Sequence, residues 1–108
     1  MARVIGLSGE LADNIHEFST VTTVSATAAV EVQATLFTFQ HVVTGGNVTF
    51  KEQGSLDGTN WYDLADAKTK GAGTFCDHYD GIMARYIRMN VTNIGGNGNT
   101  LTTTLACT

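Results

Sequence analysis

Polar and apolar residues alternate along much of the chain, as in β-strands that bury one face. The segment 48–53 follows this pattern, and the side chains predicted to share one face are Val48, Phe50 and Glu52. Asp57 and Gly58 then predict a tight turn, because glycine adopts positive φ without steric cost and Asp accepts hydrogen bonds from the following backbone. A second segment, 85–91, predicts a central strand with Ile87, Met89 and Val91 on one face.

The region 24–43 changes its alternation partway along. Every even position from Val24 to Leu36 is apolar, and this run is longer than a typical strand of about 5 to 6 residues. We therefore expect two strands with a bend near Ala28 and Ala29; a helix is the competitor, and the Thr and Val residues disfavour it. After Leu36 the apolar face changes parity and carries Phe37, Phe39, His41 and Val43. Both faces of 37–43 are partly apolar, which predicts a central strand covered by a facing sheet and by a neighbouring subunit or an arm.

The remaining pattern predicts short strands joined by tight turns. We expect turns at 44–47, 80–81 and 93–99, a flexible connection at 68–73, and strands at 74–79 and 100–107. About eight short strands in all predict an all-β fold, an antiparallel β-sandwich or jelly roll. We interpret 19–108 as a single domain and 1–18 as an N-terminal arm. The arm carries the apolar residues expected to contact a partner, namely Val4, Ile5, Leu7, Leu11, Ile15 and Phe18.

Two motifs connect this pattern to a known family. The stretch Ser55-Leu56-Asp57-Gly58-Thr59-Asn60-Trp61, followed by Ala84-Arg85-Tyr86-Ile87-Arg88, resembles the signature of discoidin-like, or galactose-binding-like, β-sandwiches. The same signature recurs in small virion proteins of tailed bacteriophages, and the resemblance covers about the C-terminal two thirds of this chain. It implies structural roles for the turn at Asp57 and Gly58 and for Tyr86 and Ile87, with Trp61 packed under a loop as part of the core.

The amino-acid composition limits the classes of partner that we expect for this chain. The formal net charge is −4, and 15% of residues are charged, so the chain lacks the basic surface that binding to nucleic acid requires. No apolar run approaches the roughly 20 residues that cross a bilayer, and the first residues lack the apolar core of a signal peptide, so we expect neither a membrane partner nor secretion. Cys76 and Cys107 are then expected as thiols, although pairing across adjacent strands remains an alternative.

No set of residues predicts catalysis, a cofactor or a metal. His78 lies near Cys76 and Asp77, but their spacing matches no zinc motif, and His16 and His41 are expected at the surface or at an edge. Asp57, Asn60 and Asp63 are better explained by a turn with Asx hydrogen bonds than by a calcium loop, which needs more carboxylates. The serines lack the context of a hydrolase nucleophile, and Gly95 to Gly98 are not followed by the Lys and helix of a phosphate loop.

The expected function is therefore structural. We predict a virion protein, made in the host bacterial cytoplasm, that decorates and stabilises a phage head by bridging subunits of the major capsid protein. It would act as a homo-oligomer, a trimer being the expected form. The alternative is a carbohydrate- or receptor-binding module of a phage tail or fibre, in which Trp61, Tyr62 and Tyr79 form an aromatic platform for a sugar.

Overall fold

Seven antiparallel β-strands make up the fold in the computed structural model, which describes residues 15–108. The strands are β1 (Ile15–Glu17), β2 (Val30–Thr44), β3 (Val48–Ser55), β4 (Tyr62–Asp63), β5 (Lys68–Lys70), β6 (Gly73–Asn93) and β7 (Thr100–Cys107). They form one sheet in the order β1-β7-β2-β6-β3-β4, with β5 also paired to β3. The predicted all-β, antiparallel, sandwich-like fold is confirmed, although two long strands replace several of the short ones.

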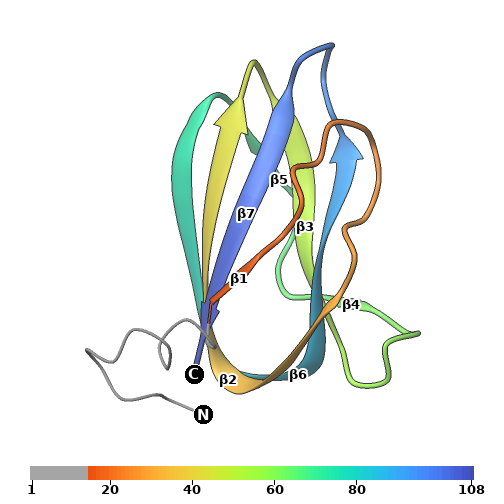
Figure 1. Ribbon diagram of the computed structural model, residues 1–108, viewed down its shortest axis with the longest axis vertical. Helices are drawn as coiled ribbons and strands as arrows, with labels where there is room; N and C mark the ends of the chain where they lie inside the picture. Colours follow the sequence, from red (N-terminus) through yellow and green to blue (C-terminus); the bar gives the residue numbers. More distant parts are fainter. Residues whose placement is uncertain (1–14) are drawn as a thin grey trace.

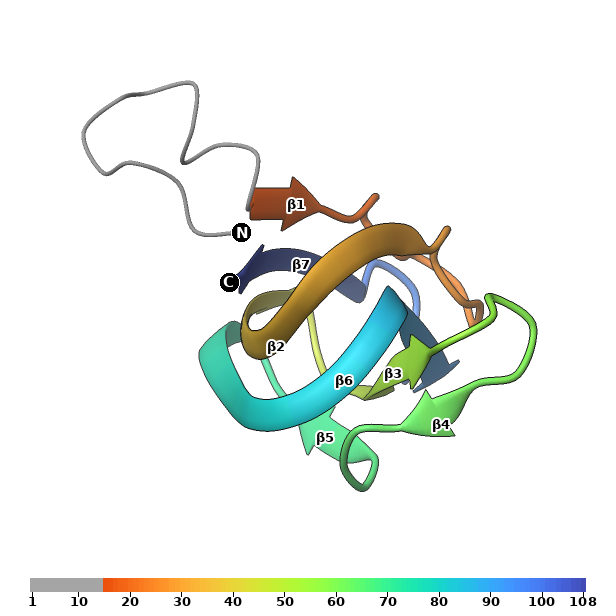
Figure 2. The same cartoon turned by 90° about the horizontal axis from the view of Figure 1, so that it is seen from below.

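The two long strands fold the sheet over on itself. β2 has 15 residues and β6 has 21, and they curve together at the lower end of the molecule (Figures 1 and 2). β6 pairs with β2 along most of its length, from Val43↔Gly73 to Val30↔Ile87, and its last part, from Tyr86 onward, pairs with β3. The prediction of a chain-reversing turn at Asp80 and Gly81 is wrong: Gly81, with a φ of +80°, lies within a continuous strand at this curve.

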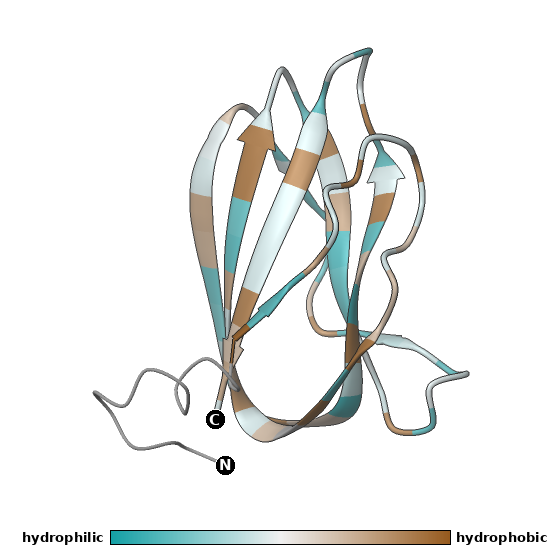
Figure 3. Cartoon of the chain, in the orientation of Figure 1, coloured by the Kyte–Doolittle hydropathy of each residue, from teal (hydrophilic) through white to brown (hydrophobic). Residues whose placement is uncertain are grey.

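The core lies between the two halves of the folded sheet. His41 of β2 contacts Phe50 of β3 with ring centroids 4.6 Å apart, although β6 separates these strands in the sheet. Polar and apolar bands alternate along β2 in Figure 3, as expected of a strand with one inward face. Register shifts between Glu31 and Leu36 move the inward face from Val32 to Phe37, which explains the change of parity in the sequence. The fully buried apolar side chains are Phe37, Phe39, Val48, Phe50, Ile87, Met89, Val91 and Leu105.

Two predicted segments are corrected. β1 pairs with β7 through Ile15↔Ala106, and Phe18 is 5% exposed within the core, so the sheet already begins inside the predicted arm of residues 1–18. The predicted flexible connection at 68–73 instead contains β5, which pairs with β3. The other apolar residues of the arm, Val4, Ile5, Leu7 and Leu11, lie outside the described residues. Within residues 15–108, no helix is long and apolar enough to cross a membrane.

Candidate functional site

Six polar side chains meet inside the fold, and we call them the interior cluster. They come from five strands, and His41, Glu52 and Thr103 point inward in phase with apolar neighbours along their own strands. Phe39 and Phe50 flank the ring of His41, and Phe39 also packs edge-on against Tyr79. The members of the cluster are His41, Glu52, Lys68, Asp77, Tyr79 and Thr103.

Glu52 is the centre of the interior cluster and is 1% exposed. Its Oε1 accepts hydrogen bonds from Lys68 Nζ and from the hydroxyl of Tyr79, both at 2.6 Å, and its Oε2 accepts one from His41 Nε2 at 2.8 Å. Burial by itself raises the pKa of Glu52, but hydrogen bonds from His41, Lys68 and Tyr79 outweigh burial and lower the pKa to about 2. Glu52 is therefore a buried carboxylate that these partners hold in its charged form.

Lys68 provides the matching positive charge. Its Nζ lies 2.6 Å from Glu52 Oε1 and 2.9 Å from Asp77 Oδ2, and the side chain is 21% exposed. Asp77 Oδ2 is also 3.2 Å from His41 Nε2, but neither contact of Asp77 Oδ2 has the alignment of a hydrogen bond, so its interactions are ionic. Burial lowers the pKa of Lys68, but the hydrogen bonds to Glu52 and Tyr79, together with the ion pair with Asp77, raise it above its usual value by a larger amount. Burial and the hydrogen bond to Glu52 raise the pKa of Tyr79 to about 12.

The hydrogen bonds of His41 determine its tautomer. A carboxylate only accepts hydrogen bonds, so Nε2 carries the proton that is donated to Glu52. In the neutral ring, Nδ1 then accepts a hydrogen bond from the hydroxyl of Thr103 at 2.8 Å. His41 is completely buried and Thr103 is 1% exposed, so both nitrogens of the imidazole are satisfied inside the protein.

A metal ion fits the interior cluster only if Lys68 moves away. One ligand atom from each of His41, Glu52 and Asp77 lies within 4.8 Å of the others, and these residue types bind transition metals. An ion bound at about 2.0 to 2.2 Å from the carboxylate oxygens would occupy the position of the Lys68 ammonium. The lysine already supplies the positive charge that the two carboxylates require.

The chain of hydrogen bonds from Glu52 through His41 to Thr103 has the connectivity of an acid, a base and a hydroxyl nucleophile. A nucleophile must reach its substrate, whereas all three of these side chains are at most 1% exposed. Asp77 and Lys68, which are partly exposed, are held together as an ion pair. The geometry therefore supports a structural role for the interior cluster.

The sequence prediction for His41 is wrong, because this residue lies in the core rather than at the surface or an edge. The signal that could have located it is its phase: His41 alternates with Phe37, Phe39 and Val43, and Glu52 alternates with Val48 and Phe50. Two ionisable side chains on inward faces predict a buried pair, because neither charge is stable alone in an apolar interior. His78, by contrast, points to the outer face, where it bonds Thr38.

The predicted turn at Asp57 and Gly58 is confirmed, and its hydrogen bonds satisfy the carboxylate. Asp57 Oδ1 accepts hydrogen bonds from the backbone N–H groups of Thr59 and Asn60, both at 2.8 Å, and Oδ2 accepts one from Asn60 Nδ2 at 2.8 Å. The backbone bond from Asn60 is the largest of the contributions that lower the pKa of Asp57. Gly58 has a φ of +80°, as the turn requires. Asx hydrogen bonds thus account for this loop, as the sequence predicted.

Trp61 does not pack in the core, which corrects another prediction. Its side chain is half-buried, and the guanidinium of Arg88 lies 4.2 Å from the centre of its ring. Arg88 in turn donates a hydrogen bond to Gln53, so the stack is held in place from β3. Ile87 is completely buried, as predicted, and Tyr86 is half-buried. Cys76 is exposed, Cys107 is buried, and no disulfide joins them, in agreement with the prediction of thiols.

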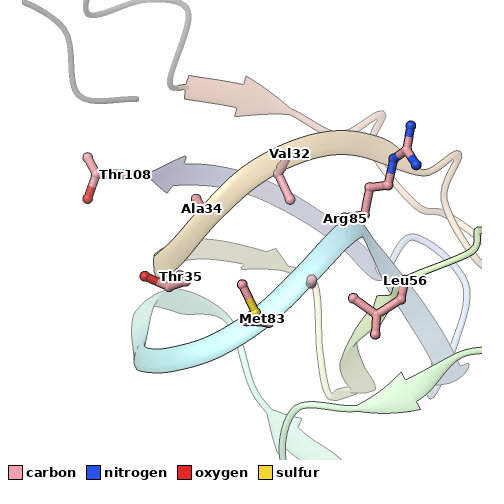
Figure 4. Close-up of a pocket in the computed structure, with 8 residues that line it drawn as sticks. Val32, Ala34, Thr35, Leu56, Met83, Arg85 and Thr108 are labelled. Carbon is pink, nitrogen blue, oxygen red and sulfur yellow. The ribbon is translucent and has the colours of Figure 1, made fainter.

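A second candidate site is an apolar groove at the curve of β2 and β6. It has a volume of about 780 Å³, and Figure 4 shows the side chains around it. Leu56 and Met83 are the two most exposed large apolar side chains in residues 15–108, at 64% and 71%, and both line this groove. The other lining residues are Val32, Ala34, Thr35, Ala84, Arg85 and Thr108.

No protein-family model matches the sequence, and no curated protein matches it.

Proposed function

We propose that this protein is a structural assembly protein of a virion, and that it decorates a phage head by bridging subunits of the major capsid protein. The apolar groove is the observation that carries the proposal. Exposed apolar patches on soluble domains mark surfaces that contact other molecules, and Leu56 and Met83 bring two large exposed side chains together.

The interior cluster is also consistent with the proposed assembly function. Its ionisable groups are bound to one another inside the fold, which leaves the outer surface for contacts with other proteins. Each contact between proteins needs to bury only about 800 Å² per partner. Several such contacts made by one oligomer, with a trimer as the proposed form, strengthen one another because they act at a high effective concentration.

The test is attachment to mature phage heads that lack this protein. We expect the purified full-length chain to sediment with such heads and to raise the temperature at which they break open, because a ligand that binds only the intact shell stabilises it. Heads to which the chain does not attach would contradict the proposed function.

A carbohydrate-binding module is the second candidate, and the position of Trp61 favours it. Trp61 lies at the surface next to Tyr62, which is 37% exposed, and partly exposed aromatic rings can stack on sugars. Arg88 covers part of the indole, however, and would have to share it with a ligand. A glycan array separates the candidates: a sugar ligand that Trp61→Ala abolishes would favour the module, whereas a sugar-blind oligomer would favour assembly.

A further inference from the structure

We propose that the apolar groove binds the N-terminal segment of a second copy of the chain, residues 1–14, as an added β-strand. The inference rests on the proposed assembly function and supplies its mechanism of self-association. In a ring of copies, each chain would donate its segment to one neighbour and receive the segment of another, which is a heterologous, closed arrangement.

The residues that line the groove are mostly apolar, which favours the binding of an apolar peptide. Val32 and Ala84 are buried at its base, with exposures of 4% and 7%, while Leu56 and Met83 stand exposed beside them. The volume of about 780 Å³ lies within the range of pockets that bury drug-sized ligands, which is enough for a few apolar side chains of a peptide. A strand laid across the groove would remove these two exposed side chains from water.

The backbone beside the groove offers an open strand edge. Along Val30–Ala34, β2 pairs with β6 on one side, whereas its ladder with β7 begins at Phe37. The carbonyl of Thr108 accepts hydrogen bonds from the N–H groups of Thr35 and Leu36, and residues 15–108 provide no strand beyond that point on this edge. Open edges of this kind bind extended peptides through main-chain hydrogen bonds.

The first described residue of the chain lies near one end of the same groove. Ile15, the first described residue, pairs with Ala106, and Thr108, which directly follows the end of β7, lines the groove. Because β1 and β7 are antiparallel, the chain that precedes Ile15 starts from the corner where β7 ends. Fourteen residues can span up to roughly 46 to 50 Å, compared with a longest molecular extent of 41 Å.

The position of the apolar residues in this segment favours a neighbouring copy over the chain's own groove. Val4, Ile5 and Leu7 lie 8 to 11 residues before Ile15, a reach of roughly 26 to 40 Å in extended form. In extended form, the segment would carry these side chains past the chain's own groove, which begins beside Thr108, and toward a neighbouring copy. The seven residues between Leu7 and Ile15 are polar or glycine except for Leu11 and Ala12.

Two full-length variants test the exchange when they are mixed. The segment variant carries Ile5→Asp and Leu7→Asp and keeps an intact groove, whereas the groove variant carries Met83→Asp and keeps an intact segment. Val24→Asp is the matched control, because Val24 is 61% exposed but does not line the groove. Leu56→Asp repeats the groove substitution at a second position, and circular dichroism checks that every variant folds.

We expect the wild type and Val24→Asp to be oligomers by light scattering, and each of the other variants alone to be a monomer, with self-association weakened at least tenfold. Mixing the segment variant with the groove variant should restore a complex of two chains, because one supplies the segment and the other the groove. A monomeric wild type, an oligomer that survives either substitution, or a mixture that stays monomeric would overturn the inference. Self-association without attachment to heads would leave the inference standing and refute the proposed function.

Discussion

The interior cluster and the apolar groove reverse the usual distribution of charged and apolar side chains. Glu52 is a charged side chain with 1% exposure, whereas Met83 is an apolar side chain with 71% exposure. The buried charge is acceptable because His41, Lys68 and Tyr79 donate hydrogen bonds to it, and an unpaired charge at that position would be very unfavourable. The exposed apolar side chains have no comparable compensation within residues 15–108. The comparison agrees with a structural role for the cluster and with the proposal that the groove binds a partner.

Neutralising Glu52 should have the largest effect on stability. Glu52→Gln keeps the shape of the side chain but leaves Lys68 without its closest counter-charge, and breaking a buried pair typically costs about 3 to 5 kcal/mol. Urea denaturation measures this change in the free energy of unfolding. The matched control is Glu31→Gln, because Glu31 pairs with Arg85 at the surface, where ion pairs contribute at most about 1 kcal/mol. Equal losses in the two variants would show that burial does not distinguish these pairs.

The pH dependence of stability should also arise from the interior cluster, through the shifted pKa values of Glu52 and Tyr79. The folded-state pKa of Glu52 is lowered from 4.5 to about 2, so its contribution is complete above pH 4.5 and is lost as the pH falls toward 2. The pKa of Tyr79 is raised from 10.0 to about 12, so its contribution is complete below pH 10 and is lost as the pH rises toward 12. Thermal unfolding across pH should therefore show a loss at each end. Glu52→Gln should flatten the acid limb and Tyr79→Phe the alkaline limb; unchanged limbs would contradict this assignment.

Removing Lys68 should change the chemistry of the interior cluster. Lys68→Ala takes away the ammonium but keeps the ligand atoms of His41, Glu52 and Asp77 together. We expect Zn²⁺ to stabilise this variant by about 2.7 kcal/mol at a hundredfold excess over its dissociation constant, and to leave the wild type unchanged. Calorimetric titration of both proteins with Zn²⁺ checks the prediction. Equal stabilisation of the wild type would show that Lys68 does not compete with the metal.

Substitution in the groove should have the smallest effect on folding. Met83→Asp replaces a side chain that is 71% exposed, and surface substitutions usually change stability by less than about 0.5 kcal/mol. The same substitution should abolish self-association. A loss of self-association with little loss of stability would distinguish the groove from the interior cluster, where substitutions should lower stability. A loss of stability as large as that of Glu52→Gln would instead place Met83 among the residues that hold the monomer together.

The sequence predicts the strand pattern much better than the way the strands combine. Alternation correctly identifies the inward side chains of 48–52 and 87–91 because each inward face is apolar or carries a single polar residue. It does not show that Gly81 lies within one long strand, since a glycine that ends a strand and one within a curved strand have the same local pattern. For this reason the sequence predicts two strands separated by a turn at 80–81, where the structure has the single strand β6.

The two candidate sites depend on contacts between distant parts of the chain. His41 and Glu52 are in phase with apolar residues, but only the folded sheet shows that they meet each other and Lys68. The groove likewise forms where β2, β6 and the loop after β3 converge, and Leu56 and Met83 are 27 residues apart (83 − 56). Trp61 is predicted in the core because large aromatic side chains are usually buried, whereas the stack with Arg88 holds it at the surface.

The molar mass of the full-length chain in solution is the most direct test of the claim that the groove serves a partner. We predict an oligomer in the wild type and a single 11.5 kDa chain in Met83→Asp, with the same free energy of unfolding per folded chain once association is taken into account. A wild-type chain that remains at 11.5 kDa at every concentration would contradict the account.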